Sequence, residues 1–118
     1  MDAEIKILKY LYDVNTCILP IDIHLSNQRN YNSYISNITV QRAVERELEI
    51  IGEAINNIVK INPAINITYA RLIIDLRNKI IHSYDNINND VIWKIVNKDI
   101  PILKQEINLL LNKYSTPK

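Results

Sequence analysis

The chain has 118 residues, which is enough for one domain with its own hydrophobic core and too few for two. We therefore expect a single domain spanning residues 1–118. The sequence contains one glycine and no phenylalanine, which argues against an all-β protein rich in tight turns. The formal net charge of +1 excludes the broad basic surface of general nucleic-acid binders, so any basic surface must be local or be formed by joining subunits.

The single cysteine, Cys17, cannot form an internal disulfide and lies in an apolar stretch. We expect a buried free thiol in a reducing compartment. Residues 1–9 carry charges without a long apolar run, and no stretch approaches the roughly 20 apolar residues of a membrane span. The sequence therefore predicts no signal peptide, no membrane segment and a cytoplasmic location.

The first half of the chain predicts two long helices. Apolar residues recur at helical spacing from Asp2 to about Leu19, and Pro20 should end or kink this helix. Residues 26–37 are polar and rich in asparagine, which predicts a connection with at most one short helical turn. The second long helix is expected from about Thr39 to Ile61, with a regular apolar stripe.

The only glycine, Gly52, falls inside this second long helix, where it costs about 1 kcal/mol relative to alanine. Either another helix approaches closely at this position, or the glycine is tolerated there without a structural role. Two more helices are expected at about 69–82 and 90–114, and Pro101 should kink or split the last one near Ile100. Four helices with short links predict an all-α, up-and-down four-helix bundle. On the last two helices the expected core residues are Leu72, Ile73, Leu76, Ile80, Ile81, Val91, Ile92, Ile95, Val96, Ile102, Leu103, Ile107, Leu110 and Leu111.

The residues best suited to chemistry cluster between Arg77 and Tyr84, in the run Arg-Asn-Lys-Ile-Ile-His-Ser-Tyr. Arg77 can hold a phosphate by two parallel hydrogen bonds, and His82 can move a proton near neutral pH. Spacing alone does not decide between this interpretation and a structural one. In the structural interpretation Arg77 pairs with an acidic neighbour and Tyr84 packs on the surface. His82 then caps the C-terminus of the helix, where a positive charge is favourable.

Arg77 and His82 are five residues apart, so on a straight helix they point about 140° away from each other. Either the helix ends near His82 and the ring turns back, or a second copy of the chain supplies the missing group. RNA cleavage by attack of the 2′-hydroxyl benefits from one group that removes a proton and another that donates one. A two-fold dimer would contain His82 twice.

The pattern Arg77-x4-His82-x-Tyr84 resembles the signature of the HEPN superfamily in its HepT-like branch. The segment Glu47–Ala54 is similar to the second-helix segment of that family, and the segments 90–96 and 99–101 resemble its fourth helix. The three segments occur in the family's order, so the resemblance covers most of the chain. Ser83 departs from the pattern, because glycine is common at that position. The resemblance implies a dimerising four-helix bundle with the motif in a cleft between subunits.

The resemblance also implies a function, that of a toxin in a toxin–antitoxin pair. Such a toxin is a metal-independent ribonuclease without a cofactor, with tRNA as the leading substrate. A nucleotidyltransferase antitoxin of the MntA type would silence it by transferring AMP to the motif tyrosine, here Tyr84. By position, Arg77 would stabilise the phosphate in the transition state, His82 would act as general acid or base, Asn78 would orient the substrate or the ring, and Tyr84 would bind the substrate. The alternative is a non-catalytic HEPN binding subunit of a nucleotidyltransferase.

The remaining candidates carry less chemistry. Glu53, near the apolar stripe of the second long helix, is either a partner for Arg77 in the cleft or an ordinary structural or surface carboxylate. We expect His24 to be structural and Trp93 to be a core or dimer anchor. One cysteine and two distant histidines do not make a metal site.

Overall fold

The computed structural model describes residues 2–25, 30–82 and 88–115. All the regular secondary-structure elements among these residues are helices, which confirms the all-α class. In chain order the elements are α1 (Asp2–Leu25), α2 (Tyr31–Ile35), α3 (Ile38–Ile61), α4 (Ala70–His82), α5 (Asn89–Lys94), the π-helical turn η2 (Ile95–Asp99) and α6 (Ile100–Ser115).

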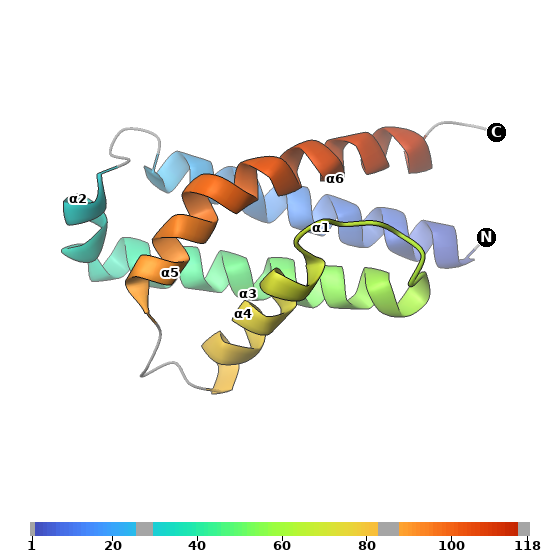
Figure 1. The fold of residues 1–118 in the computed structure, drawn as a ribbon. Coiled ribbons are helices and arrows are strands. Elements are labelled where there is room, and N and C mark those ends of the chain that lie inside the picture. Colours follow the sequence, from blue (N-terminus) through green and yellow to red (C-terminus); the bar gives the residue numbers. More distant parts are fainter. Residues whose placement is uncertain (1, 26–29, 83–87, 116–118) are drawn as a thin grey trace.

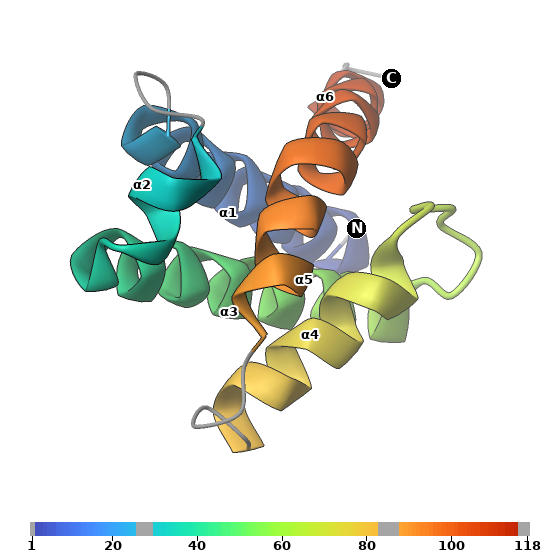
Figure 2. The same ribbon diagram turned by 60° about the vertical axis from the view of Figure 1, so that its left-hand side comes forward.

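The long helices are arranged around α3. Helix α1 packs along α3 in the opposite direction, α4 lies across α3, and α6 packs on α1 (Figures 1 and 2). Helix α5, the π-helical turn and α6 follow one another without a break. None of the described helices is long and apolar enough to cross a membrane.

Asparagine side chains begin several of these helices. The side-chain oxygen of Asn37 accepts a hydrogen bond from the backbone N–H of Val40 at 3.1 Å, and that of Asn88 accepts one from Asp90 at 2.8 Å. Each bond satisfies a backbone donor that has no partner within the helix. The abundant asparagines therefore help to set where the helices start.

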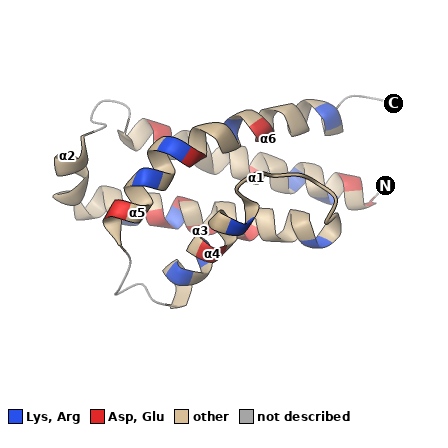
Figure 3. Cartoon of the chain, viewed as in Figure 1, with Lys and Arg blue, Asp and Glu red and all other residues tan. Residues whose placement is uncertain are grey.

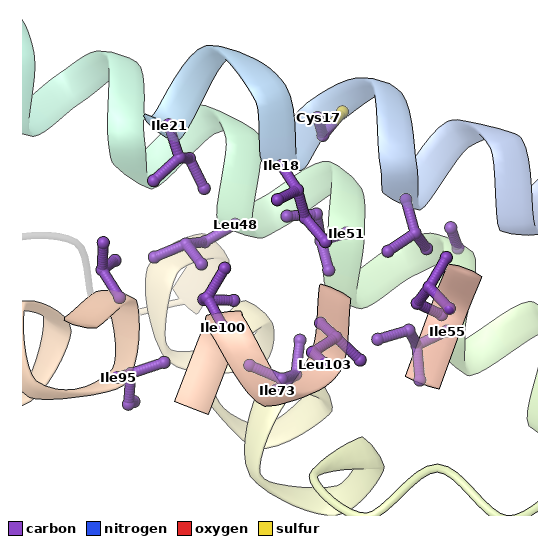
Figure 4. Packing of buried hydrophobic residues seen from close by; sticks show 14 of the residues in the cluster. Cys17, Ile18, Ile21, Leu48, Ile51, Ile55, Ile73, Ile95, Ile100 and Leu103 are labelled. Carbon is purple, nitrogen blue, oxygen red and sulfur yellow. The ribbon is translucent and has the colours of Figure 1, made fainter. Parts of the chain in front are cut away.

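The core is built almost entirely from isoleucine, leucine and valine. Side chains from α1, α3, α4 and α6 meet in one interior cluster, and burial of each contributes about 1.5–3 kcal/mol (Figure 4). The cluster includes Ile18, Leu48, Ile51, Ile55, Ile73, Ile100 and Leu103.

The predicted end of the first helix near Leu19 was wrong, because α1 continues through Pro20 to Leu25. A proline inside a helix costs about 3 kcal/mol through its missing N–H and its ring. Ile21 and Leu25 are both buried in the core, and their burial is of a size that offsets this cost. Tertiary packing thus keeps the helix intact beyond the proline.

Three predicted core residues, Leu72, Val91 and Ile102, are exposed, and these predictions were wrong. Each lies beside the buried stripe of its helix. The last helix is not split at Pro101, but the π-helical turn Ile95–Asp99 ends directly before Ile100, so regular α-helical geometry is interrupted close to the predicted position. After this turn the buried stripe passes through Ile100 and Leu103.

Candidate active site

Arg77 lies on the side of α4 that faces α3, with 24% of its side chain exposed. Its Nη2 forms an ion pair with a carboxylate oxygen of Glu53 on α3, and its Nη1 donates a hydrogen bond to Oδ1 of Asn78 at 2.9 Å. Its Nε is buried and has no hydrogen-bond partner among the described residues. Two of the three guanidinium nitrogens are therefore held by neighbours that the sequence analysis had singled out.

Gly52 makes this arrangement possible. A Cβ atom at position 52 would overlap Cβ of Arg77, and it would lie 2.9 Å from Cγ of Arg77 and 3.1 Å from the carbonyl oxygen of Ile73. The predicted close approach of another helix to Gly52 is thus confirmed, and the approaching helix is α4. The aliphatic part of Arg77 lies directly on the α3 backbone, with Glu53 next in the chain to receive its charged end.

A pocket of about 350 Å³ opens beside Arg77, where α1, α3 and α4 meet. Arg77 and Glu53 form part of its wall, so the motif arginine borders an open space rather than the core. The full lining consists of Tyr10, Asp13, Arg46, Glu49, Ile50, Glu53, Ala54, Asn57, Arg77 and Ile81.

The charges around the pocket are largely balanced in pairs. Arg46 lies 3.5 Å from a carboxylate oxygen of Glu49, and Lys9 lies 3.2 Å from one of Asp13. Basic and acidic residues are interspersed along the helices in the view of Figure 3. The site therefore offers individual cations with carboxylate neighbours, as the net charge of the sequence had indicated.

A second hollow lies beside the pocket, toward the N-terminal half of α3. It is lined by Arg42, Glu45 and Ile80, together with three residues that it shares with the pocket. Partial burial raises the pKa of the Glu45 carboxyl above its ordinary value, while the nearby charge of Arg42 acts in the opposite direction. The carboxylate of Glu45 is therefore less favoured in the folded protein than in water.

His82 is the last residue of α4 and is exposed. It does not line the pocket beside Arg77, and no hydrogen bond or ion pair joins the two described side chains. Helix α4 extends unbroken to His82, so the two residues lie about 140° apart around its axis, as expected for a helix. Ser83 and Tyr84 lie outside the described residues.

The other candidates lie away from the site. Cys17 is buried, as predicted, and its burial together with a hydrogen bond to Glu47 raises the pKa of the thiol to about 12. His24 is exposed in the last turn of α1. Trp93 forms an aromatic cluster with Tyr31 and Tyr34, with ring centres 5.9 and 5.2 Å from its own. Within the described ranges no three His, Cys, Asp or Glu side chains are grouped closely enough to hold a metal ion.

Sequence reasoning missed the pocket residues that come from outside the motif, above all Tyr10, Asp13 and Asn57. Tyr10 and Asp13 lie on α1, more than 60 residues before Arg77 in the chain. Nothing in their local pattern distinguishes them from ordinary residues of an amphipathic helix. Only the packing of α1 against α3 brings them to the site.

Comparison with known proteins agrees with the family resemblance. The family model described as ribonuclease HepT-like matches residues 6–110 of the chain. The chain is 36% identical over 104 residues to "Putative RNase MJ1380" of Methanocaldococcus jannaschii, an alignment covering 86% of this chain and 93% of that protein. It is 34% identical over 105 residues to "Probable ribonuclease HepT" of Thermococcus cleftensis, covering 86% and 92% of the two chains. No solved structure gives a significant match.

Proposed function

The chain belongs to the ribonuclease HepT-like family, and from this premise we propose that it is a metal-independent ribonuclease toxin whose reaction depends on Arg77 and His82. The observation that carries the proposal is the placement of Arg77 in the wall of an open pocket, with Glu53 and Asn78 holding its guanidinium. A merely structural arginine would not require an adjoining open space of this size.

Arg77 would bind the phosphate at which the RNA is cut. Its planar guanidinium can donate two parallel hydrogen bonds to phosphate oxygens, and these bonds strengthen as negative charge develops in the transition state. Asn78 and Glu53 restrict the orientation of the guanidinium before substrate arrives. Glu53 also partly neutralises Arg77, so the phosphate must compete with this carboxylate for the same donors.

His82 would transfer protons in the reaction. The 2′-hydroxyl oxygen attacks the neighbouring phosphorus while a base takes its proton, and the bond from phosphorus to the 5′-oxygen breaks as that oxygen receives a proton from an acid. The products are a 2′,3′-cyclic phosphate and a 5′-hydroxyl. Because His82 does not reach the Arg77 pocket of its own chain, we propose a two-fold dimer in which two copies of His82 serve one cleft.

Silencing would act on the same cleft. We propose that an MntA-type nucleotidyltransferase transfers AMP from ATP to the hydroxyl of Tyr84, with release of pyrophosphate. Tyr84 follows His82 by two residues, so in the proposed dimer cleft the added phosphate would compete with the RNA phosphate for Arg77. Asn78 would help to orient the substrate, with tRNA the leading candidate from the family resemblance.

The first test is the His82→Ala variant of the full chain. We expect it to fold normally and to lose both RNA cleavage and growth inhibition. His24→Ala is the matched control, because it removes the other histidine from an exposed site away from the pocket, and it should remain active. An active, toxic His82→Ala protein would overturn the proposal.

A second measurement addresses the partner. The intact mass of the chain, expressed with and without a neighbouring MntA-type nucleotidyltransferase, should show an added adenylyl group only in the co-expressed sample. The modification should map to Tyr84 and be absent from Tyr84→Phe. If the chain neither cuts RNA nor inhibits growth alone, and yet binds the nucleotidyltransferase without modification, then the non-catalytic binding subunit is the correct function.

A further inference from the structure

The pocket beside Arg77 extends beyond the residues that the proposed reaction uses. Tyr10 and Asp13 of α1 and Asn57 of α3 all line it, and none of them has a role in the cleavage step. Its volume of about 350 Å³ falls within the range of about 300–1,000 Å³ that is typical of small-molecule sites. It can therefore accommodate a chemical group larger than the phosphate itself.

The composition of the walls indicates a flat and partly apolar group. Ile50, Ala54 and Ile81 supply apolar surface, and the aromatic ring of Tyr10 also borders the pocket. The ammonium of Lys9 lies 5.0 Å from the centre of the Tyr10 ring, next to the pocket. Proteins that read single-stranded RNA commonly place an unstacked base against such an aromatic side chain.

The charge around the pocket argues against a second anionic group and favours a group that donates hydrogen bonds. Three carboxylates, Asp13, Glu49 and Glu53, line the pocket with only two arginines, Arg46 and Arg77, and each arginine has a carboxylate partner. A second phosphate would be repelled by this arrangement. An amino group would find acceptors, because Lys9 contacts Oδ2 of Asp13 and Oδ1 remains able to accept a hydrogen bond.

We propose that this pocket binds one unstacked RNA base next to the phosphate held by Arg77. Tyr10 contacts the ring of the base and Asp13 accepts a hydrogen bond from its amino group. This inference rests on the ribonuclease function proposed above. Arg77 belongs both to the motif and to the pocket wall, so a strand bound through its phosphate at Arg77 brings a neighbouring base to the pocket.

The arrangement predicts a preference among the four bases. Adenine, cytosine and guanine each carry an amino group that can donate to a carboxylate, as cytosine commonly does to aspartate or glutamate. Uracil carries no amino group, and its one donor on this edge, N3–H, lies between two carbonyl oxygens that the Asp13 carboxylate would repel. The pocket should therefore disfavour uracil.

The test measures binding without cleavage, using the full-length His82→Ala protein and labelled single-stranded octamers. The probes are an octamer of uridines and octamers in which one central uridine is replaced by A, by C or by an abasic residue. We expect the A and C probes to bind about fivefold more tightly than the all-uridine probe or better. The abasic probe should bind no better than the all-uridine probe.

Two substitutions in the pocket locate the effect. Asp13→Asn retains the shape of the side chain and should remove most of the preference for A and C. Tyr10→Ala should weaken binding of the A and C probes by about fivefold or more, the effect of losing one aromatic contact with a base. Tyr12→Ala and Asp2→Asn, exposed on α1 and outside the pocket lining, should change neither result.

The outcomes separate this inference from the proposed function. If wild-type protein cuts RNA but the probes bind equally well and the two substitutions have no effect, the base site is wrong and the ribonuclease stands. If the probes show the preference but wild-type protein does not cut RNA, the base site stands and the ribonuclease is wrong. If Asp13→Asn or Tyr10→Ala instead changes the oligomeric state by light scattering, the pocket is an interface between copies and the base site is overturned.

Discussion

Gly52 of α3 lies directly against the side chain of Arg77 on α4, so that a methyl group on Gly52 would come within 2.9 Å of Cγ of Arg77. The next residue, Glu53, pairs with the guanidinium at the far end of the same side chain. Two consecutive residues of α3 therefore hold Arg77, one through the close approach of its backbone and the other through charge.

We expect Gly52→Ala to reduce RNA cleavage by about tenfold or more, because an error of about 1 Å in the position of a catalytic group can cost about a hundredfold. The added methyl group must push Arg77 away from α3, since it also meets the carbonyl oxygen of Ile73 at 3.1 Å. Overpacking costs about 1–3 kcal/mol and the gain in helix propensity returns about 1 kcal/mol. Initial cleavage rates and urea unfolding would measure both effects.

Thr39→Ala, at an exposed position in the first turn of the same helix, is the control for this substitution. It should leave the cleavage rate unchanged. A Gly52→Ala protein that is more stable than the wild type and cuts RNA at the same rate would show that Arg77 does not depend on the close approach.

Glu53→Gln should separate the two effects of the carboxylate on Arg77. Removing the negative charge frees Arg77 for the RNA phosphate, so KM should fall. The fall should be at most about fivefold, which corresponds to the interaction free energy of a partly exposed ion pair. The guanidinium then loses its fixed orientation, so kcat should also fall. Steady-state kinetics would resolve the two changes, with Glu106→Gln, which alters a carboxylate bonded to Thr68 away from the pocket, as the control. Unchanged KM and kcat would remove Glu53 from the site.

Helical periodicity predicted much of the fold because local packing and local pattern agree there. The second long helix was expected from Thr39 and begins at Ile38, and the third was expected from Tyr69 and begins at Ala70. The prediction failed at Pro20, where burial of later residues outweighs the local signal, and at Leu72, which lies beside the buried stripe. These outcomes depend on neighbouring helices, which a local pattern does not contain.

The candidate site likewise contains residues that the sequence could identify and residues that it could not. Arg77, Asn78 and His82 are close in the chain, so a short motif was enough to identify them as candidates. The Glu53 partner was one of two alternatives, and the structure forms that ion pair. Tyr10 could not be identified from the sequence, because its place beside Arg77 follows from the packing of α1 on α3.

Gln41 should contribute strongly to stability, because its buried amide joins three elements. Its Nε2 donates to the carbonyl oxygens of Tyr34 and Ile35, both at 2.9 Å, and its Oε1 accepts from Asn89 at 3.5 Å. Gln41→Leu would remove the donor to the carbonyl oxygen of Ile35 and one of two donors to that of Tyr34, which keeps the backbone N–H of Asn37 at 3.1 Å. We expect a cost of about 1–3 kcal/mol in the free energy of unfolding. Urea unfolding measures this cost, and Gln105→Leu at an exposed position of α6 is the control.

A loss below about 0.5 kcal/mol for Gln41→Leu, the usual range of surface substitutions, would mean that water replaces the amide without penalty. Because α2 and α5 contact the rest of the protein partly through Gln41, the variant should also expose Trp93 more strongly to solvent. Tryptophan fluorescence of the folded variant would register that change, since Trp93 is the only tryptophan.

Glu45 should make the folded protein less stable as the pH rises through the weakly acidic range. Burial raises the pKa of its carboxyl above the ordinary value of 4.5, so the unfolded chain loses this proton at a lower pH than the folded protein does. Below pH 4.5 both states hold the proton and the group has no effect. Above the pKa of the folded state both have lost it, and the folded protein bears the full cost of the buried charge.

Glu45→Gln removes this titration, so its melting temperature should exceed that of the wild type at pH 7 and converge with it near pH 4. Arg42→Gln tests the cause, because the charge of Arg42 holds the pKa of Glu45 down. Without that charge the pKa should rise further, and stability should fall more steeply between pH 4 and 7. In the variant that carries both Arg42→Gln and Glu45→Gln, this steeper fall of stability with pH should be absent. Melting curves across this range at constant ionic strength would contradict the argument if all four proteins followed parallel lines.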